Sequence, residues 1–503
     1  MSIASLLSRG NVTRDFTASI VVFLVAMPLC MGIAIASGVP PEKGLITGII
    51  GGIIVGALAG SPLQVSGPAA GLAVIIFELV RDQGLSALGP ILVLAGIIQF
   101  VAGVLRVGGW FRAVSPAVVH GMLAGIGVLI VAGQFHVLFD QKPLPSGLQN
   151  LAAMPGRLLG LSPTSLEGTE LAAIIALVTI AVMLGWEKLR PASMKLVPGA
   201  LMGVVAGTLL AWGFGLSVAR VTVPESIAGA ITLPGPDMFA RWLDPSLLAA
   251  AVAIAFIASA ETLLSAAAVD RMHDGVRTNY NKELRAQGVG NLLCGLAGAL
   301  PMTGVIVRSS ANVQAGAQTR LSTMLHGVWI LGFVALLPWL LREIPMAALG
   351  AVLVVTGWRL VNFGHAKHLL KHYGMLPAAI WAITLVTVVA EDLLTGVLVG
   401  IGLSLIELLP HWRRLGLKLD HEHGEEESAI RLAGTASFLA VPKLTSTLDA
   451  VPQGRPVRFD VSDLAAVDHT SAEIIREWVN RRRAAGAPVH LTGTPELTER
   501  LAA

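Results

Sequence analysis

The sequence predicts an all-α polytopic membrane protein that ends in a small α/β domain. Of its 503 residues, 54% are apolar and only 13% are charged, which is far from the usage of soluble domains. Apolar stretches follow one another from Phe16 to residue 409, whereas the remainder alternates between charged, strand-like and helix-like segments. These observations separate a membrane domain, residues 1–409, from a soluble tail.

The apolar stretches suit a bilayer core of about 30 Å, which a helix of about 20 residues crosses. We expect about fourteen spans, several of them shorter than a full crossing. They begin at Phe16, Gly44, Gly67, Pro90, Pro116, Glu170, Leu196, Pro245, Glu283, Ser309, Leu321, Ile344, Leu376 and Thr395.

Basic residues indicate how these spans are oriented. With the N-terminus inside, Lys and Arg gather in the cytoplasmic loops, and the outside loops at residues 139–168 and 216–244 contain few of them. We therefore expect a multi-pass protein of the inner cell membrane with both termini in the cytoplasm. Two halves, about 12–215 and 244–409, would have about seven spans each, and an odd number inverts the second half relative to the first.

The tail begins with a charged linker, residues 410–427, and continues as an α/β domain, residues 428–503. The segments "AIRLAG", "PVRFDVSDL" and "PVHLTG" are typical of strands, and Thr470 to Ala485 is typical of a helix with Thr470 as its cap. A last helix is predicted after Thr494, with Pro495 at its first position.

Two polar interruptions fall at the third span of each half. The first is "AGSPLQVSGPAAG", Ala59 to Gly71. We expect Gly67 to let the backbone turn, Pro68 to occupy a first helical turn, and a half-helix to run from about Ala69 to Val80.

The second interruption is "AGALPMTGVIVRSSAN", Ala297 to Asn312. Its β-branched Val305 to Val307 is strand-like, and Ser309 or Ser310 can cap the half-helix that follows. Irregular backbone at membrane depth is tolerated where it is buried in protein or lines a wet cavity, so both breaks are expected to line a site.

Two half-helices would direct their amino ends toward each other near the midplane. Each end carries roughly half a positive charge, so the pair suits a small anion. The residues predicted to bind it are Gly67, Ala69, Ala70, Ile306, Val307, Arg308 and Ser309. The alternative is that Gly-Pro only kinks a packed helix, and the matching positions of the two breaks favour the binding site.

Glu261 lies deep in the eighth span, where a charge costs about 2.5 to 3.5 kcal/mol. Ser265 lies one turn further along the same helical face, so Glu261 and Ser265, with Gly304, are predicted to hold Na+ as a coupling ion, or Glu261 carries a proton. Arg308 at the tip of the second half-helix would attract an anion. A structural Glu261 to Arg308 ion pair is the alternative.

Several function classes are disfavoured by the sequence. The net charge of +3 is small and its basic residues sit in short loops, which argues against nucleic-acid binding. Cys30 and Cys294 lie in apolar segments and indicate neither a disulfide framework nor a metal site. The spans contain no nucleophile with a base, so an enzyme is not expected, and no cofactor is predicted beyond a coupling Na+.

The sequence resembles the SulP sulfate permease family of anion transporters. The matching pieces are "GVPPEKGLITGIIGG", "SGPAAG" and "NKELRAQGVGNLLCGLAGALPMTGVIVRSSANVQAGAQTRLS", and the tail with "VRFDVSDLAAVDHTSAEII" resembles a shortened STAS domain. The resemblance implies a seven-plus-seven inverted repeat with core and gate domains, half-helices at spans 3 and 10, elevator-type transport and a homodimer. It places Glu261 and Ser265 at the cation position of sodium-coupled members and Arg308 at the anion site.

The leading hypothesis is therefore a secondary transporter of a small inorganic anion within a lipid bilayer. The variant "VIVRSSANVQAG" is most similar to the branch associated with carbonic anhydrases, which favours bicarbonate over sulfate and implies a functional link to a carbonic anhydrase. Ile35 stands where proton-coupled members often carry a glutamate, which weakens a dicarboxylate transporter. An uncoupled anion channel or exchanger of the same fold is the main alternative.

Overall fold

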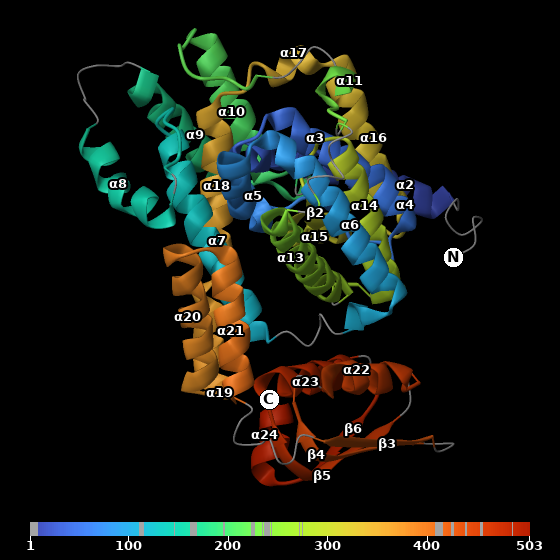
Figure 1. Cartoon of the computed structure of the whole chain (residues 1–503). Coiled ribbons are helices and arrows are strands. Elements are labelled where there is room, and N and C mark those ends of the chain that lie inside the picture. The colour runs from blue at the N-terminus through green and yellow to red at the C-terminus, as the bar shows by residue number, and fades with distance from the viewer. Residues whose placement is uncertain are drawn as a thin grey trace. The chain divides into compact units, whose positions relative to one another are not determined.

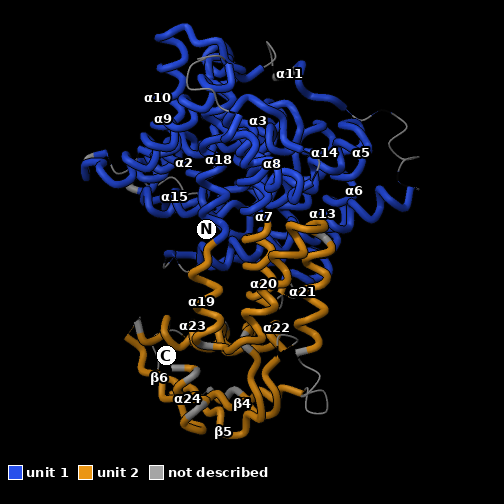
Figure 2. The backbone as a smooth tube through the Cα atoms, turned by 90° about the vertical axis from the view of Figure 1, so that its left-hand side faces the viewer, with its two compact units in different colours: residues 1–108, 126–361 blue, residues 109–125, 362–503 orange. Residues whose placement is uncertain are grey.

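The computed structural model falls into two compact units, residues 1–108 with 126–361 and residues 109–125 with 362–503 (Figure 2). The residues it describes are 9–109, 115–144, 146–160, 168–194, 197–222, 227–233, 235, 242, 244–270, 272–273, 275–407, 416–423, 427–437, 440–452, 456–484 and 486–502.

The first unit is built of helices, apart from two short strands (Figure 1). Its first half contains α2 (Arg9–Ala36), α3 (Pro41–Ile50), a π-helical turn (Gly51–Val55), α4 (Gly56–Leu58), α5 (Ala73–Gln83), α6 (Leu88–Val104), the end of α7 (Pro116–Val137), α8 (Gly147–Leu159), α9 (Gly168–Leu189), α10 (Gly199–Gly213) and α11 (Ile227–Ala230). Its second half contains α13 (Pro245–Asp270), α14 (Tyr280–Leu296), α15 (Ile306–Gln314), α16 (Leu321–Leu336), α17 (Pro338–Leu341) and α18 (Met346–Leu360).

Each predicted apolar segment contains a helix. Seven helical stretches among the described residues are long and apolar enough to cross a membrane: Asn11–Ala36, Pro41–Leu58, Leu85–Val104, Pro116–Val137, Gly168–Leu189, Pro245–Asp270 and Met346–Lys371. Four further apolar helices are shorter. The chain is thus a multi-pass membrane protein, and the count of about fourteen spans stays a prediction.

The two interruptions form two short strands that pair with each other. β1 (Ser66–Pro68) runs antiparallel to β2 (Met302–Gly304), with Gly67 opposite Thr303. The prediction that Pro68 begins a helix is wrong, because Pro68 ends β1; a 3-10 turn at Ala70–Leu72 then leads into α5.

The second interruption also differs from its prediction. Ile306 and Val307 are not strand-like, because α15 begins at Ile306. Val305, the residue before α15, has an extended backbone and donates its N–H to the Val65 carbonyl at 2.8 Å. The contact between the two interruptions therefore fixes where α15 begins. Neither Ser309 nor Ser310 caps this helix, since both lie within it.

Close packing of α6 on α14 supports the second interruption. A Cβ atom added at Gly288 of α14 would lie 2.5 Å from the Phe100 nitrogen and 2.7 Å from the Gly96 oxygen of α6. Asn291, one turn beyond Gly288, donates to the Met302 carbonyl at 3.1 Å and accepts from the Met302 N–H at 2.8 Å. The helix pair therefore fixes β2 in place.

The second unit contains the start of α7, further helices and a four-stranded sheet. The elements are α19 (Phe363–Tyr373), α20 (Met375–Ala390), α21 (Leu393–Glu407), β3 (Leu417–His423), β4 (Ser428–Ala436), α22 (Val441–Ala450), β5 (Val457–Val467), α23 (His469–Ala484), β6 (Val489–Thr492) and α24 (Pro495–Ala502). The strand order is β3-β4-β5-β6, with β3 antiparallel to β4 and the other pairs parallel. Phe459 and Trp478 pack in its core.

The predicted tail elements are largely confirmed, with two additions. β3 lies within residues 410–427, the segment predicted as a linker, of which 410–415 and 424–426 lie outside the described residues. Helix α22 is not predicted by the sequence either. Thr470 does not cap α23, because the Ser471 N–H donates to Asp468 Oδ1 at 2.7 Å and Thr470 is 1% exposed. An acidic side chain suits this position as well as a hydroxyl.

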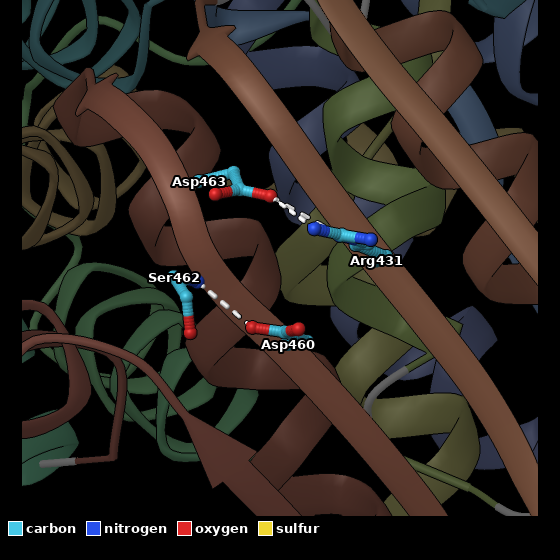
Figure 3. A network of polar contacts seen from close by, with 4 residues as sticks. All are labelled: Arg431, Asp460, Ser462 and Asp463. Atoms are coloured by element: carbon cyan, nitrogen blue, oxygen red, sulfur yellow. Dashed lines mark hydrogen bonds and ion pairs between the residues drawn. The ribbon is translucent and has the colours of Figure 1, made fainter.

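A polar network marks an irregularity between β4 and β5 (Figure 3). Arg431 aligns with Asp460 but forms its ion pair with Asp463 at 2.5 Å, because β5 carries one extra residue here. The hydroxyl and backbone N–H of Ser462 hold the pKa of Asp460 below its ordinary value. Solvent screens the exposed ion pair, so the network shapes the bulge more than it stabilises the domain.

We expect Gly288→Ala to destabilise the membrane domain, because its new methyl group would force the α6 and α14 backbones apart at a cost of about 1 to 3 kcal/mol. Gly332→Ala on α16 is the matched control, since a Cβ atom there would meet nothing within 4 Å. The midpoint of thermal unfolding in detergent should fall for the first variant and stay within error for the second. Equal midpoints would contradict the close approach of the two helices.

Candidate functional site

The site is the crossing of the two interruptions inside the first unit. The N–H of Val65 donates to Ser309 Oγ at 2.9 Å, and the Asn312 amide donates to the Leu63 carbonyl at 3.0 Å. The side chains of α15 therefore hold the backbone that enters β1. Hydrogen bonds of this kind replace those that an unbroken helix would supply, which buried backbone in a membrane requires.

Helix α13 attaches to the same crossing through Thr262. Its hydroxyl accepts the Gly304 N–H at 3.0 Å, and its carbonyl accepts from Gln64 Nε2 at 2.8 Å. Thr262 thereby binds both interruptions at once. The residue next to it, Glu261, is brought to the same place.

Arg308 of α15 is completely buried, and its guanidinium covers Gly67 of β1. A Cβ atom at Gly67 would collide with Arg308 Nη1 and lie 3.2 Å from Cζ. The expected role of Gly67 in a turn is therefore wrong: Gly67 lies in a strand, and its missing side chain makes room for the guanidinium.

None of the three guanidinium nitrogens of Arg308 forms a hydrogen bond of normal geometry with a described residue, and the side chain that interacts with the guanidinium is the Cys30 thiol, a weak acceptor. A buried cation with so weak a partner costs several kcal/mol. The arrangement therefore calls for a ligand that accepts hydrogen bonds and carries negative charge.

The carboxylate of Glu261 lies against Gly71, at the amino end of the first half-helix. A Cβ atom at Gly71 would be 2.8 Å from Oε1 and 3.0 Å from Oε2. Glu261 Oε2 and Thr303 Oγ1 are both buried, and the Thr303 hydroxyl lies near enough to the Glu261 carboxylate to interact with it, although neither atom forms a hydrogen bond of normal geometry among the described residues. Ser265, one helical turn further on, is 8% exposed. These oxygen atoms are of the type that Na+ binds.

Glu261 and Arg308 do not form an ion pair, although both side chains contact the segment that consists of β1 and the 3-10 turn after it. Arg308 lies over Gly67 and Glu261 lies over Gly71. The predicted structural ion pair is thus replaced by two separate positions, one positive and one negative.

The remaining predicted residues line the ends of the half-helices. Ala69 is buried, Ala70 is partly buried, and Ile306 and Val307 at the first turn of α15 are 38% and 41% exposed. Apolar side chains thus surround N–H groups that a helix start leaves without intrahelical partners. Gly304 lies in β2 and reaches the site through its N–H bond to Thr262.

Sequence reasoning missed four polar residues of the crossing: Gln64, Thr262, Thr303 and Asn312. Each is at most 2% exposed. In the sequence, each of the four is a polar residue within an apolar stretch, beside one of the two interruptions or beside Glu261. That pattern could have indicated them. Among the described residues no group of three or more His, Cys, Asp or Glu side chains gathers into a candidate metal site.

Comparisons with known proteins find several relatives of this chain. The model of the sulfate permease family matches residues 12–384. The putative sulfate transporter YbaR of Bacillus subtilis is 26% identical over 496 residues, covering 98% of this chain and 96% of that protein. The putative sulfate transporter YvdB of the same organism is 31% identical over 397 residues, covering 78% and 73%. The bicarbonate transporter BicA of Synechocystis sp. is 25% identical over 533 residues, covering 99% and 91%.

Two solved structures share the fold. The transmembrane domain of a cyanobacterial BicA gives a TM-score of 0.67 at 24% identity, covering 79% of this chain and 99% of that one. The overall structure of SLC26A9 gives 0.70 at 14% identity, covering 98% and 86%.

We expect Gly67→Ala and Arg308→Met to be strongly coupled in stability. The alanine methyl would displace the guanidinium, and the methionine background removes the clash, so the coupling should be about 0.5 to 3 kcal/mol. A double-mutant cycle on thermal unfolding measures it. Gly71→Ala is the control, because Gly71 faces Glu261 and its effect should add to that of Arg308→Met. Additive effects for Gly67→Ala would contradict the placement of the guanidinium.

Proposed function

The chain belongs to the sulfate permease family, a family of anion transporters, and from this premise we propose that it is a secondary active transporter of one small inorganic anion. The observation that carries the proposal is the buried guanidinium of Arg308, which faces Gly67 and has no ion pair with a described residue. An oxyanion would accept charge-assisted hydrogen bonds from it and from the half-helix N–H groups.

We propose bicarbonate as the substrate, with sulfate next. Arg308 and two half-helix ends supply about two positive charges, and an ionised Glu261 removes one, so the site suits a monovalent anion when no cation is bound and can hold a monovalent or a divalent anion when Na+ or a proton occupies Glu261. Two relatives named bicarbonate transporters and several named sulfate transporters support the same short list. Sulfate would require a cation or a proton at Glu261 to balance its second charge.

A coupling ion at Glu261 fits an uptake direction. Moving a monovalent anion into a negative interior costs about 2.3 kcal/mol per 100 mV. Na+ held by Glu261 with Ser265 and the neighbouring Thr303 oxygen, or a proton on Glu261, would offset that charge. The two positions at Gly71 and Gly67 would let cation and anion bind side by side without cancelling each other.

A further part of the proposal concerns how the site moves during transport. We propose that the core carrying β1, β2, α5 and α15 moves relative to gate helices, as an elevator, and that two copies form a homodimer in the inner membrane with cytoplasmic termini. A carbonic anhydrase that supplies or consumes bicarbonate would be its functional partner. A channel or exchanger of the same fold would use the same anion site without a cation at Glu261.

Uptake into proteoliposomes tests the proposal. Bicarbonate, sulfate, chloride and a dicarboxylate are compared under imposed Na+ and pH gradients. We expect bicarbonate flux to saturate and to follow one of the two gradients, and Glu261→Gln to abolish the gradient response. Glu187→Gln, which alters an ion pair with Arg359 away from the site, should transport normally. Gradient-independent, rectifying flux would identify a channel.

Arg308→Ala should raise the half-saturating anion concentration by at least about tenfold, because each charge-assisted bond to the anion contributes about 1.5 to 3 kcal/mol. Arg308→Lys keeps the charge but loses the planar fork, so its effect should be intermediate. Arg359→Ala, at the exposed ion pair with Glu187, is the control and should leave the value unchanged. An unchanged half-saturating anion concentration in Arg308→Ala would show that the arginine has a structural role and does not bind the anion.

A further inference from the structure

Glu283 of α14 is a fully buried carboxylate that does not belong to the anion site. Its Oε2 atom accepts the backbone N–H groups of Gly60 at 2.7 Å and Ser61 at 2.8 Å, in the turn after α4. No ion pair joins Glu283 to a described residue. A buried carboxylate is stable only when such charge-assisted bonds replace its hydration, so the turn and the carboxylate depend on each other.

The other carboxylate oxygen of Glu283, Oε1, is connected to β1 through Gln287. Gln287, one helical turn beyond Glu283, donates through Nε2 to Glu283 Oε1 at 3.1 Å and to Ser66 Oγ at 2.6 Å. One carboxylate therefore holds both ends of residues 60–66, directly at the turn and through Gln287 at the first residue of β1.

Residues 60–66 lead straight into the anion site. Ser66 precedes Gly67, which has no room for a Cβ atom beneath the Arg308 guanidinium, and Gly71 has almost none beneath Glu261. A shift of this segment by one bond length would move both glycines away from the two charges. Contacts this close make the site sensitive to whatever anchors the segment.

Helix α3 of the first half holds the second interruption in a similar way. Thr47 Oγ1 accepts the Leu300 N–H at 2.9 Å and donates to the Leu300 carbonyl at 2.9 Å, just before β2. Lys43, one helical turn before Thr47 on α3, donates to the Ala230 carbonyl at 2.7 Å and to Thr232 Oγ1 at 2.8 Å. Each half of the chain thus anchors the broken segment of the other.

We propose that Glu283 is a positioning residue for the anion site. It sets the place of residues 66–71 by fixing the turn at Gly60 and Ser61, and it never touches the anion. The inference rests on the proposed function only in naming the crossing an anion site, because the anchoring itself is a property of the protein without substrate.

Labelling of a cysteine placed at Ala70 tests this. In a Cys30→Ala, Cys294→Ala background, Ala70→Cys reacts with a membrane-impermeant methanethiosulfonate reagent in detergent, without added anion. Glu283→Ala should raise the labelling rate by at least about fivefold, because two hydrogen bonds that close the segment are lost. Glu283→Gln keeps one acceptor oxygen, so its labelling rate should lie between those of the parent and of Glu283→Ala. Glu343→Ala, which removes an ion pair with Arg220, is the control and should label at the parent rate.

Labelling at the parent rate in a monodisperse Glu283→Ala protein would overturn the proposal. If Glu283→Ala does not fold, Glu283→Gln decides in its place, and an unchanged rate in that variant overturns it equally. Uptake by the wild-type chain, without the reporter cysteine, separates the two conclusions. Faster labelling of Glu283→Ala with no anion flux in the wild type would refute transport but keep the anchoring, whereas parental labelling with normal flux in the wild type would refute only the anchoring.

Discussion

The pairing of β1 with β2 is the interaction on which the rest of the membrane domain depends. Three residues from each half of the chain exchange the backbone hydrogen bonds that a continuous helix would have made. In an apolar surrounding an unpaired backbone group costs several kcal/mol, so neither interruption is tolerable alone. Because they satisfy each other, both half-helices begin at one place, and α13, α14 and α3 attach to that place through Thr262, Gln287, Asn291 and Thr47.

The crossing also explains how two opposite charges remain apart in the interior. Arg308 and Glu261 reach the same strand and turn, but the guanidinium lies over Gly67 and the carboxylate over Gly71. An ion pair between Arg308 and Glu261 would neutralise both charges and leave no charged atom free to bind a ligand. Kept separate, each has unsatisfied atoms that suit a ligand of the opposite charge. The proposed carriage of an anion together with a cation would rest on this separation.

The sequence predicted where the helices break, because Gly, Pro, Ser and Gln interrupt otherwise apolar runs. It also predicted Arg308 and Glu261, since a charge in such a run requires a function or a partner. It could not reveal the pairing register, because Pro68, Ile306 and Val307 have local preferences that the contact between distant segments overrides. Gly67 was expected to turn the chain, and its actual role, clearance for a guanidinium 241 positions away, is visible only in three dimensions.

The same limit applies to anchoring residues and to the tail. Glu283 and Gln287 stand in an ordinary helical stretch, and only their contacts with Gly60, Ser61 and Ser66 reveal what they do. In the tail, alternation predicts β4, β5 and β6, but β3 is so rich in charge that its sequence is typical of a linker. An edge strand needs few apolar residues, which is why its pattern is weak.

The central claim is that the buried guanidinium of Arg308 is half of an anion site. An experimental structure at saturating bicarbonate tests it most directly. The account predicts density for a planar anion within hydrogen-bond distance of the Arg308 guanidinium and of N–H groups at the starts of the two half-helices. A guanidinium paired with protein atoms, with no anion at the crossing, would contradict it.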